Sequence, residues 1–129
     1  MEVERLKKIP LFEAVPEGDL KVIATFAELT EVPTGKVLVE EGDFSNDLMA
    51  IEEGTAEVTR DGEHVAVLGP GDVFGEMGLL EKQHRNATVT ATSPIKLIVL
   101  TRWELMRMRR KMPDVVERIE RLIEERKSN

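Results

Sequence analysis

The amino-acid sequence predicts a mainly β protein, in which helices precede and follow a small antiparallel barrel. Between Leu29 and Thr101, short runs rich in Val, Ile, Leu and Thr are broken by glycines, with turn signals every ~8–12 residues, as in a β-sandwich or barrel. Two hairpin signals lie within that zone, and apolar residues at helical spacing occur before and after it. We therefore expect N-terminal helices in 1–28, strands in 29–101 and C-terminal helices in 102–129, forming one domain.

The N-terminal zone is expected to contain two helices. Val3, Leu6 and Ile9 recur every three residues, and Pro10 ends that segment. A second helix is expected after Pro16, with acidic residues in its first turn and an apolar stripe made of Leu20, Ile23, Ala24 and Ala27. Strong helix propensity ends after this stripe.

Two hairpins and two further strands are expected in the central zone. One hairpin would pair 49–53 with 55–59 across Gly54, and the other would pair 57–60 with 64–67 across Asp61-Gly62. An Asp-Gly pair is a strong two-residue hairpin signal. From 87 to 92, alanine or valine alternates with threonine, as in a half-buried strand. Pro94 then leads into Ile95–Leu100, whose nearly continuous apolar run predicts a buried strand.

The C-terminal zone returns to a helical pattern. Trp103 and the methionines at 106, 108 and 112 are expected in the core. The basic residues between 102 and 111 have the composition of a partner-binding surface, but in a chain of net charge −7 we expect a solvated helix face that pairs with nearby acids. Pro113 opens a last helix, whose apolar stripe consists of Val115, Val116, Ile119, Leu122 and Ile123.

Composition excludes several classes of function. Eighteen basic and 25 acidic residues give a net charge of −7, which argues against non-specific binding of nucleic acid. Two histidines are too few for the clusters of catalytic metal sites, so no metal is expected. No apolar run approaches the ~20 residues that would span a bilayer. The absence of cysteine excludes disulfides and fits a cytoplasmic protein.

The segment from 69 to 92 differs from the rest of the chain because four of the nine glycines lie within ten positions. Gly69-Pro70-Gly71-Asp72 predicts a turn. Next, Gly75–Leu80 suits a single helical turn, whose first amides would have no intrahelical partner and would favour an anion. Nine positions after Glu76, the guanidinium of Arg85 would suit bidentate recognition of a phosphate. Glu76 can only accept hydrogen bonds, as a sugar hydroxyl would require. This set of groups describes a site for a sugar phosphate.

The same residues carry a family resemblance. The segment Phe74–Leu80 (FGEMGLL), followed by Arg85–Val89 (RNATV), resembles the phosphate-binding cassette of cyclic nucleotide-binding domains. Ile9–Phe12 (IPLF) is similar to the N-terminal helices of that family, and Leu68–Asp72 (LGPGD) to the turn before the cassette. The resemblance implies a β-roll, which is a jelly-roll-like barrel, with N-terminal helices, a short phosphate-cassette helix and C-terminal helices.

The resemblance also implies a ligand and the residues that bind it. Glu76 would bind the ribose 2′-hydroxyl, and Arg85 would pair with the cyclic phosphate. The full implied set is Phe74, Gly75, Glu76, Met77, Gly78, Arg85, Asn86 and Ala87. The expected ligand is cAMP in preference to cGMP, with no cofactor. The chain departs from the family at His84, where many members have proline, and at Asn86, where cAMP binders often have alanine or serine and cGMP binders threonine.

The last helix has two compatible roles. Its apolar stripe is expected to pack on the barrel or on a second copy, and by resemblance it would also close over the base, with Ile119 and Leu122 as the capping residues. We see no nucleophile with a base and no paired acids, so we expect a non-catalytic sensor that signals to a protein partner, or self-associates, through its C-terminal helices. The alternatives are the sensor part of a catabolite-activator-like transcription regulator and a protein-interaction barrel without a ligand.

Overall fold

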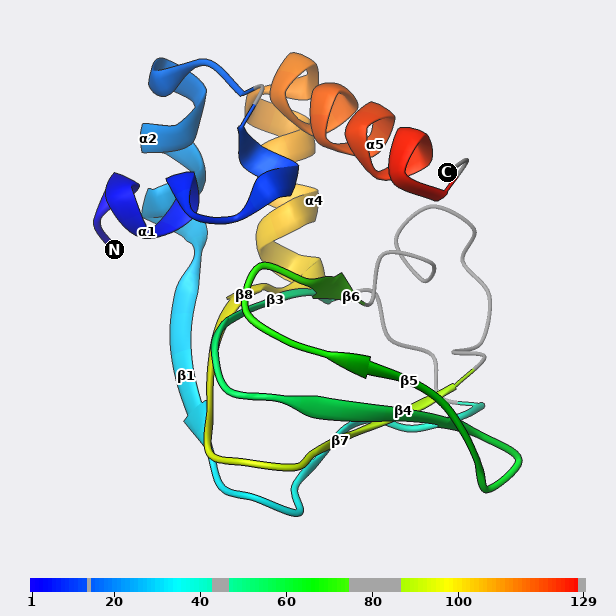
Figure 1. The fold of residues 1–129 in the computed structure, drawn as a ribbon. Helices are drawn as coiled ribbons and strands as arrows, with labels where there is room; N and C mark the ends of the chain where they lie inside the picture. The colour runs from blue at the N-terminus through cyan, green and yellow to red at the C-terminus, as the bar shows by residue number, and fades with distance from the viewer. Residues whose placement is uncertain (14, 43–46, 75–86, 128–129) are drawn as a thin grey trace.

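The computed structural model describes residues 1–13, 15–42, 47–74 and 87–127, with side chains described as far as Arg121. Figure 1 shows a barrel of strands below a layer in which the N-terminal and C-terminal helices lie together. The predicted order of helices, strands and helices is confirmed. In chain order the elements are α1 (Val3–Lys7), η1 (Pro10–Phe12), α2 (Glu17–Phe26), β1 (Glu28–Val32), β2 (Val37–Val39), β3 (Leu48–Glu53), β4 (Ala56–Arg60), β5 (Glu63–Leu68), β6 (Val73–Phe74), β7 (Thr88–Ala91), β8 (Ile95–Leu100), α4 (Arg102–Lys111) and α5 (Pro113–Lys127).

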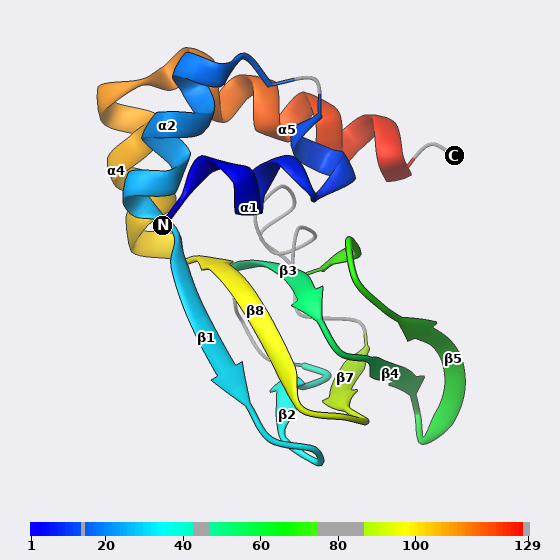
Figure 2. The same ribbon diagram turned by 60° about the vertical axis from the view of Figure 1, so that its left-hand side comes forward.

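The strands form two four-stranded antiparallel sheets that face each other (Figure 2). Sheet A has the order β1-β8-β3-β6, and sheet B has the order β2-β7-β4-β5. Among the described strands, the chain changes sheet at every connection except the one between β4 and β5. Such a double sheet is the jelly-roll-like β-roll that the family resemblance implied, so the fold class is confirmed.

The hairpin predicted across Gly54 is wrong. Strand β3 pairs with β6 and β8 in sheet A, whereas β4 pairs with β5 and β7 in sheet B. Gly54 is therefore a corner where the chain passes from one sheet to the other, with φ at +99°. The corner is bound to the β7–β8 connection, because the Thr55 amide donates to Ser93 Oγ at 2.9 Å and the Thr92 amide donates to the Thr55 carbonyl at 2.9 Å. The predicted hairpin left only Gly54 between its two strands, one residue fewer than the shortest common hairpin turn needs.

The hairpin predicted across Asp61-Gly62 is confirmed. Strands β4 and β5 pair in antiparallel register, with Arg60 opposite Glu63. Asp61 and Gly62 both have positive φ, at 54° and 81°, which matches the turn type that suits the twist of paired strands. The alternation predicted for 87–92 is also present, since Val89 and Ala91 are buried and the threonines of β7 are half-buried.

Strand β8 separates two hydrophobic clusters. Its side chains alternate, so that Ile98 and Leu100 face the helices while Ile95 and Leu97 face the barrel interior. The helical cluster contains the apolar stripe predicted for α2 together with buried residues of α4 and α5. The interior cluster consists of Val39, Ile51, Ala56, Phe74, Val89, Ala91, Ile95 and Leu97.

The prediction that Trp103 and Met106 belong to the core is wrong. Its side chain is 68% exposed, and Met106 is 43% exposed. Leu105 and Met108 are the buried residues of α4. The predicted pairing of the basic stretch is confirmed at Arg107, which binds Glu104, and at Arg109, which binds Glu120 of α5. Trp103 was expected in the core because of its apolar character alone. Its position around α4 directs the side chain away from the barrel, and this position decides its exposure.

Helix α5 is held by the helices around it. Val115, Val116 and Ile119 are buried in the helical cluster, as the stripe predicted. Arg118 forms an ion pair with Asp19 of α2, 99 residues earlier in the sequence. A shorter-range pair lies at the N-terminus, where Lys7 donates to Glu17 at 2.6 Å, which raises the pKa of Lys7 and lowers that of Glu17.

Thr101 caps α4 at its N-terminus. Its Oγ1 accepts a hydrogen bond from the Glu104 amide at 3.3 Å, and the two residues form the T-x-x-E pattern of a capping box. We expect Thr101→Ala to lower the free energy of unfolding by about 1 kcal/mol in a urea titration. Thr101→Ser keeps the oxygen and serves as the control. Equal destabilisation by the serine and alanine variants would contradict a capping role.

Candidate functional site

The structure describes the frame of the predicted site but not its centre. Phe74 and Ala87, the first and last members of the predicted set, lie within the described residues. The others, Gly75, Glu76, Met77, Gly78, Arg85 and Asn86, lie outside them, as do the predicted cassette helix and the side chain of Leu122. Phe74 ends β6 in sheet A, and the next described residue, Ala87, precedes β7 in sheet B. The predicted cassette therefore joins the two sheets.

The turn before the cassette is closed by hydrogen bonds within it and is bound by others to β3. The Asp72 amide donates to the Gly69 carbonyl at 3.0 Å, and the Asp72 carboxylate accepts from the Gly69 amide at 2.7 Å. Gly71 donates to the Ile51 carbonyl at 2.8 Å, and Ile51 donates in turn to Asp72 at 2.9 Å. Gly71 has φ at +92°, and a Cβ there would lie 3.2 Å from Pro10 of η1. The turn before the cassette is thereby hydrogen-bonded to the barrel and lies close to η1.

Phe74 ends β6 opposite Met49 of β3. Its side chain is 7% exposed and belongs to the interior cluster of the barrel. In the described structure it anchors the cassette by packing, and its predicted contact with a ligand stays a prediction.

Ala87 is half-buried and precedes β7, which is the strand between β2 and β4 in sheet B. The next residue, Thr88, accepts a hydrogen bond from the Glu41 amide at 3.1 Å through Oγ1. Glu41 in turn accepts from the Asp61 amide at 2.9 Å, so the β4–β5 turn is linked to the same point. The end of the cassette thus leads into β7, a strand with partners on both sides, while its start follows β6, which pairs with β3.

The barrel supplies apolar side chains that the sequence analysis did not assign to the site. They are packed against the interior cluster yet only partly buried: Leu38, Met49, Val58, Leu68 and Val99. An apolar wall of this kind suits the flat faces of a ligand held at a barrel. The alternation along β4 and β5 was the available signal, since Val58 and Leu68 point inwards in that pattern.

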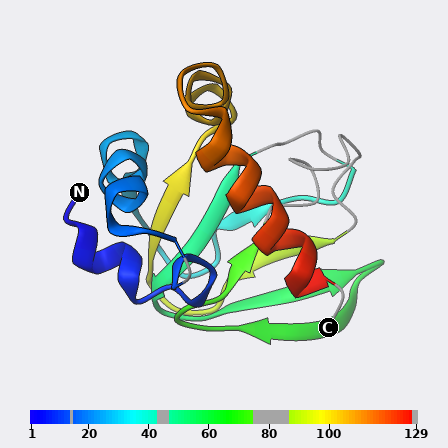
Figure 3. The same cartoon turned by 90° about the horizontal axis from the view of Figure 1, so that it is seen from above.

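Helix α5 crosses above the barrel from α4 towards the side where the β4–β5 hairpin lies (Figures 1 and 3). Ile119, predicted to cap a base, is fully buried in the helical cluster. It would therefore reach a ligand only after α5 repacks. Its role as a capping residue stays a prediction.

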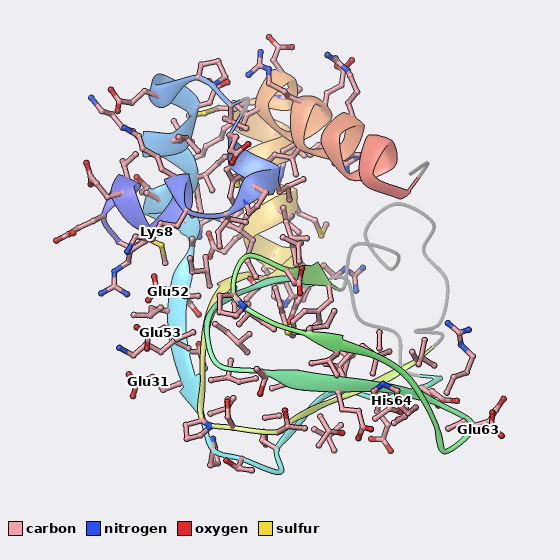
Figure 4. All side chains as sticks on the ribbon, viewed as in Figure 1. Lys8, Glu31, Glu52, Glu53, Glu63 and His64 are labelled. Carbon is pink, nitrogen blue, oxygen red and sulfur yellow. The ribbon has the colours of Figure 1, made fainter. Side chains whose placement is uncertain are left out.

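A groove of about 360 Å³ lies elsewhere, at the lower end of sheet A. In this groove Lys96 Nζ of β8 lies 3.9 Å from Glu31 Oε1 of β1 and 3.6 Å from Glu53 Oε2 of β3. The three charged side chains therefore form a row across neighbouring strands. Figure 4 shows Glu31 and Glu53 beside β1, on the opposite side of the view from His64. The groove contains none of the predicted site residues, and its charges are already paired within it; its other lining residues are Val32, Pro33, Pro94 and Ile95.

Within the described ranges, no group of three or more His, Asp or Glu side chains could hold a metal ion. His64 is exposed and contacts Glu57 at 2.9 Å on the outside of the β4–β5 hairpin. None of the described helices is long and apolar enough to cross a bilayer.

The family model described as "Cyclic nucleotide-binding domain" matches residues 29–112 of this chain. The cAMP-dependent protein kinase regulatory subunit of Schizosaccharomyces pombe is 34% identical over 93 residues, which cover 71% of this chain and 23% of that protein. The chain spans less than two thirds of the length of the first curated relatives that it matches.

Two solved structures are similar in both fold and sequence. The N-terminal domain of a transcriptional regulator from Streptomyces coelicolor has a TM-score of 0.79 and 29% identity, covering 100% of this chain and 96% of that chain. The regulatory domain of Toxoplasma gondii PKA, solved with cAMP, has a TM-score of 0.72 and 32% identity, covering 81% and 41%.

Proposed function

The chain belongs to the cyclic nucleotide-binding domain family, and from that premise we propose that it binds a cyclic nucleotide, cAMP in preference to cGMP, as a non-catalytic regulatory module. The observation that carries the proposal is the cassette: Glu76 and Arg85 stand at the family's spacing, inside a segment whose two ends are held by the barrel. The preference for cAMP is supported by similarity to a cAMP-dependent regulatory subunit and to a domain solved with cAMP.

In this proposal the anionic and hydroxyl groups of the ligand are bound separately. Arg85 pairs with the cyclic phosphate, together with amides of the Gly75–Gly78 segment and Ala87, while Glu76 accepts from the ribose 2′-hydroxyl. The half-buried apolar residues of the barrel, such as Val58 and Leu68, form the wall beside the sugar and base. No protein group needs to change its covalent state, which is consistent with a sensor.

The proposed signal is a change in the position of α5. A ligand shifts a conformational equilibrium only by its differential affinity for the two states. Ile119 is buried against the helices in the described structure, so a state in which it caps the base would exchange one apolar contact for another. The Arg118–Asp19 and Arg109–Glu120 pairs join α5 to α2 and α4, and they would have to rearrange in that exchange. The output would be read by a protein partner or by a second copy.

Calorimetric titration tests the proposal. The protein is unfolded and refolded to remove any co-purified nucleotide, and cAMP, cGMP and 5′-AMP are then titrated separately. We expect saturable binding of cAMP, weaker binding of cGMP and much weaker binding of 5′-AMP. At a hundredfold excess over Kd, cAMP should add roughly 2.7 kcal/mol to the free energy of unfolding, and the melting temperature should rise by several degrees. No heat and no thermal shift with either cyclic nucleotide, from folded protein, would overturn the proposal and favour a ligand-free interaction barrel.

A second candidate is the sensor part of a longer transcription regulator. It is favoured by similarity over the whole chain to the N-terminal domain of the Streptomyces coelicolor regulator. The reading frame in the genome distinguishes the two, because a regulator requires a helix-turn-helix in the same protein. This candidate shares the proposed ligand and differs only in what the movement of α5 controls.

A further inference from the structure

Helix α4 presents an outward face whose composition is unusual for a solvated surface. At about 100° per residue, Trp103, Met106, Arg107 and Arg110 fall on one side of the helix, opposite the buried Leu105 and Met108. Trp103 is 68% exposed and Met106 is 43% exposed. Tryptophan, methionine and arginine are the residues enriched at protein interfaces and in their hot spots. We call Trp103, Met106, Arg107 and Arg110 the α4 face.

The α4 face lies at the border of the helical layer. Figure 3, which views the molecule from above, shows α4 at one margin of this layer with α2 and α5 to one side of it. Arg107 lies over the ring of Phe26 in α2, 5.7 Å from its centroid, so the face continues onto the neighbouring helix. Arg102 lies over the ring of Trp103 at 5.7 Å and helps to hold the indole in place.

The face is positive although the chain as a whole is negative. Of the five basic residues of α4, Arg107 and Arg110 belong to the α4 face, which contains no acidic residue, whereas the chain has a net charge of −7. Arg107 is paired with Glu104 at 3.3 Å, while no ion pair in the described part of the chain involves Arg110. A positive, aromatic surface on an acidic protein favours association with a negative partner and disfavours most others.

We propose that the α4 face docks an acidic segment of another protein, which places a large apolar side chain on Trp103 and Met106 and carboxylates on Arg107 and Arg110. A second copy is the less suitable occupant. Isologous docking would bring the arginines of the face against their own equivalents, and like charges brought together at an interface oppose association. An acidic, partly apolar segment instead complements both parts of the face.

The inference rests on the proposed function in one respect: the docked partner would read the movement of the helices. The docking itself is a property of the described surface and can be measured without nucleotide. Trp103 is the only tryptophan in the chain, so its fluorescence reports directly on the face.

The test selects random 16-residue peptides displayed on phage against the full chain, immobilised through its C-terminus, with and without cAMP. We expect the enriched peptides to contain more Asp and Glu than Lys and Arg, together with at least one large apolar residue. A synthetic peptide of the most enriched sequence should shift the emission of Trp103 to shorter wavelength. Trp103→Ala and Arg110→Glu should each weaken its binding by about tenfold or more, measured with a fluorescently labelled peptide.

The matched control is Lys111→Glu, which makes the same charge change at an exposed position about 100° around the helix from Arg110. It should weaken binding far less than Arg110→Glu. Because Trp103 is mostly exposed, Trp103→Ala should leave the melting temperature nearly unchanged, which separates lost docking from lost folding. The inference is overturned if no peptide is enriched, if the enriched peptides are not acidic, or if they bind both face variants as well as the wild type. If the calorimetric titration detects no binding of a cyclic nucleotide and the peptide binds equally well with and without cAMP, the sensor proposal is overturned while the docking face stands.

Discussion

Replacing Arg85 by alanine is expected to weaken cAMP binding by at least about a hundredfold. The variant removes the proposed cationic partner of the cyclic phosphate, and truncating one member of a desolvated charge pair costs about 2–5 kcal/mol. A hundredfold change in Kd corresponds to roughly 2.7 kcal/mol, within that range. Calorimetric titration of cAMP measures the change, and the melting temperature of the ligand-free protein shows whether the variant folds.

Two further variants make the result specific. Arg85→Lys keeps the positive charge but loses the planar fork that suits a phosphate, so its affinity should fall between those of the wild type and the alanine variant. Arg110→Ala removes an arginine from the exposed side of α4 and should leave cAMP affinity unchanged. If Arg85→Ala binds cAMP with wild-type affinity, Arg85 is not the phosphate partner and the assignment of the cassette is wrong.

Gly54→Ala is expected to produce the largest loss of stability, about 3 kcal/mol or more. Gly54 has φ at +99°, where a residue with a Cβ is strained by roughly 1–2 kcal/mol. A Cβ would also overlap the Pro94 carbonyl oxygen and lie 2.9 Å from Cγ1 and 3.0 Å from Cα of Ile95. Pro94 immediately precedes β8 and Ile95 begins it, and β8 is buried and pairs with β1 and β3, so these atoms cannot move away cheaply; overpacking adds about 1–3 kcal/mol.

Gly35→Ala is the matched control for this prediction. Gly35 has φ at +90°, and a Cβ there meets no atom within 4 Å. Gly35→Ala should therefore lower the free energy of unfolding only by the cost of the positive φ, about 1–2 kcal/mol. Urea titrations of both variants give the difference between their free energies of unfolding. This difference measures the effect of the close approach between Gly54 and the β7–β8 connection. Equal destabilisation by the two substitutions would show that the corner tolerates a methyl group.

The sequence predicted strands β3, β4, β5, β7 and β8 but did not assign β1, β2 or β6. It predicted a strand's partner correctly only where that partner was local. Asp61-Gly62 identified a true hairpin because its turn geometry is encoded in two adjacent residues. Across Gly54, the same approach paired β3 with β4, although both edges of β3 are taken by strands that follow much later in the chain. Such pairing depends on which sheet each strand enters, and that choice is made by packing of the whole barrel.

The site shows a similar division. The spacing of Glu76 and Arg85 and the glycines around them is local information, and it is sufficient to indicate the family from the sequence. For the half-buried apolar wall of the barrel, the alternation along β4 and β5 indicates that Val58 and Leu68 point inwards, but their degree of exposure depends on how the two sheets close. Trp103 was misplaced for a related reason: its hydrophobicity is evident in the sequence, but its direction depends on how α4 docks.

The pairing of α2 with α5 has a consequence for the order in which the molecule is completed during synthesis. Asp19 and Arg118, which join these helices, are 99 residues apart in the chain. At ~5–20 residues per second, α2 leaves the ribosome roughly 5–20 s before α5 can cover it. Until then Leu20 and Ile23 lack part of the helical cluster that buries them. The barrel can form in the interval, so the helical layer is the part of this molecule that a nascent-chain chaperone would encounter unfinished.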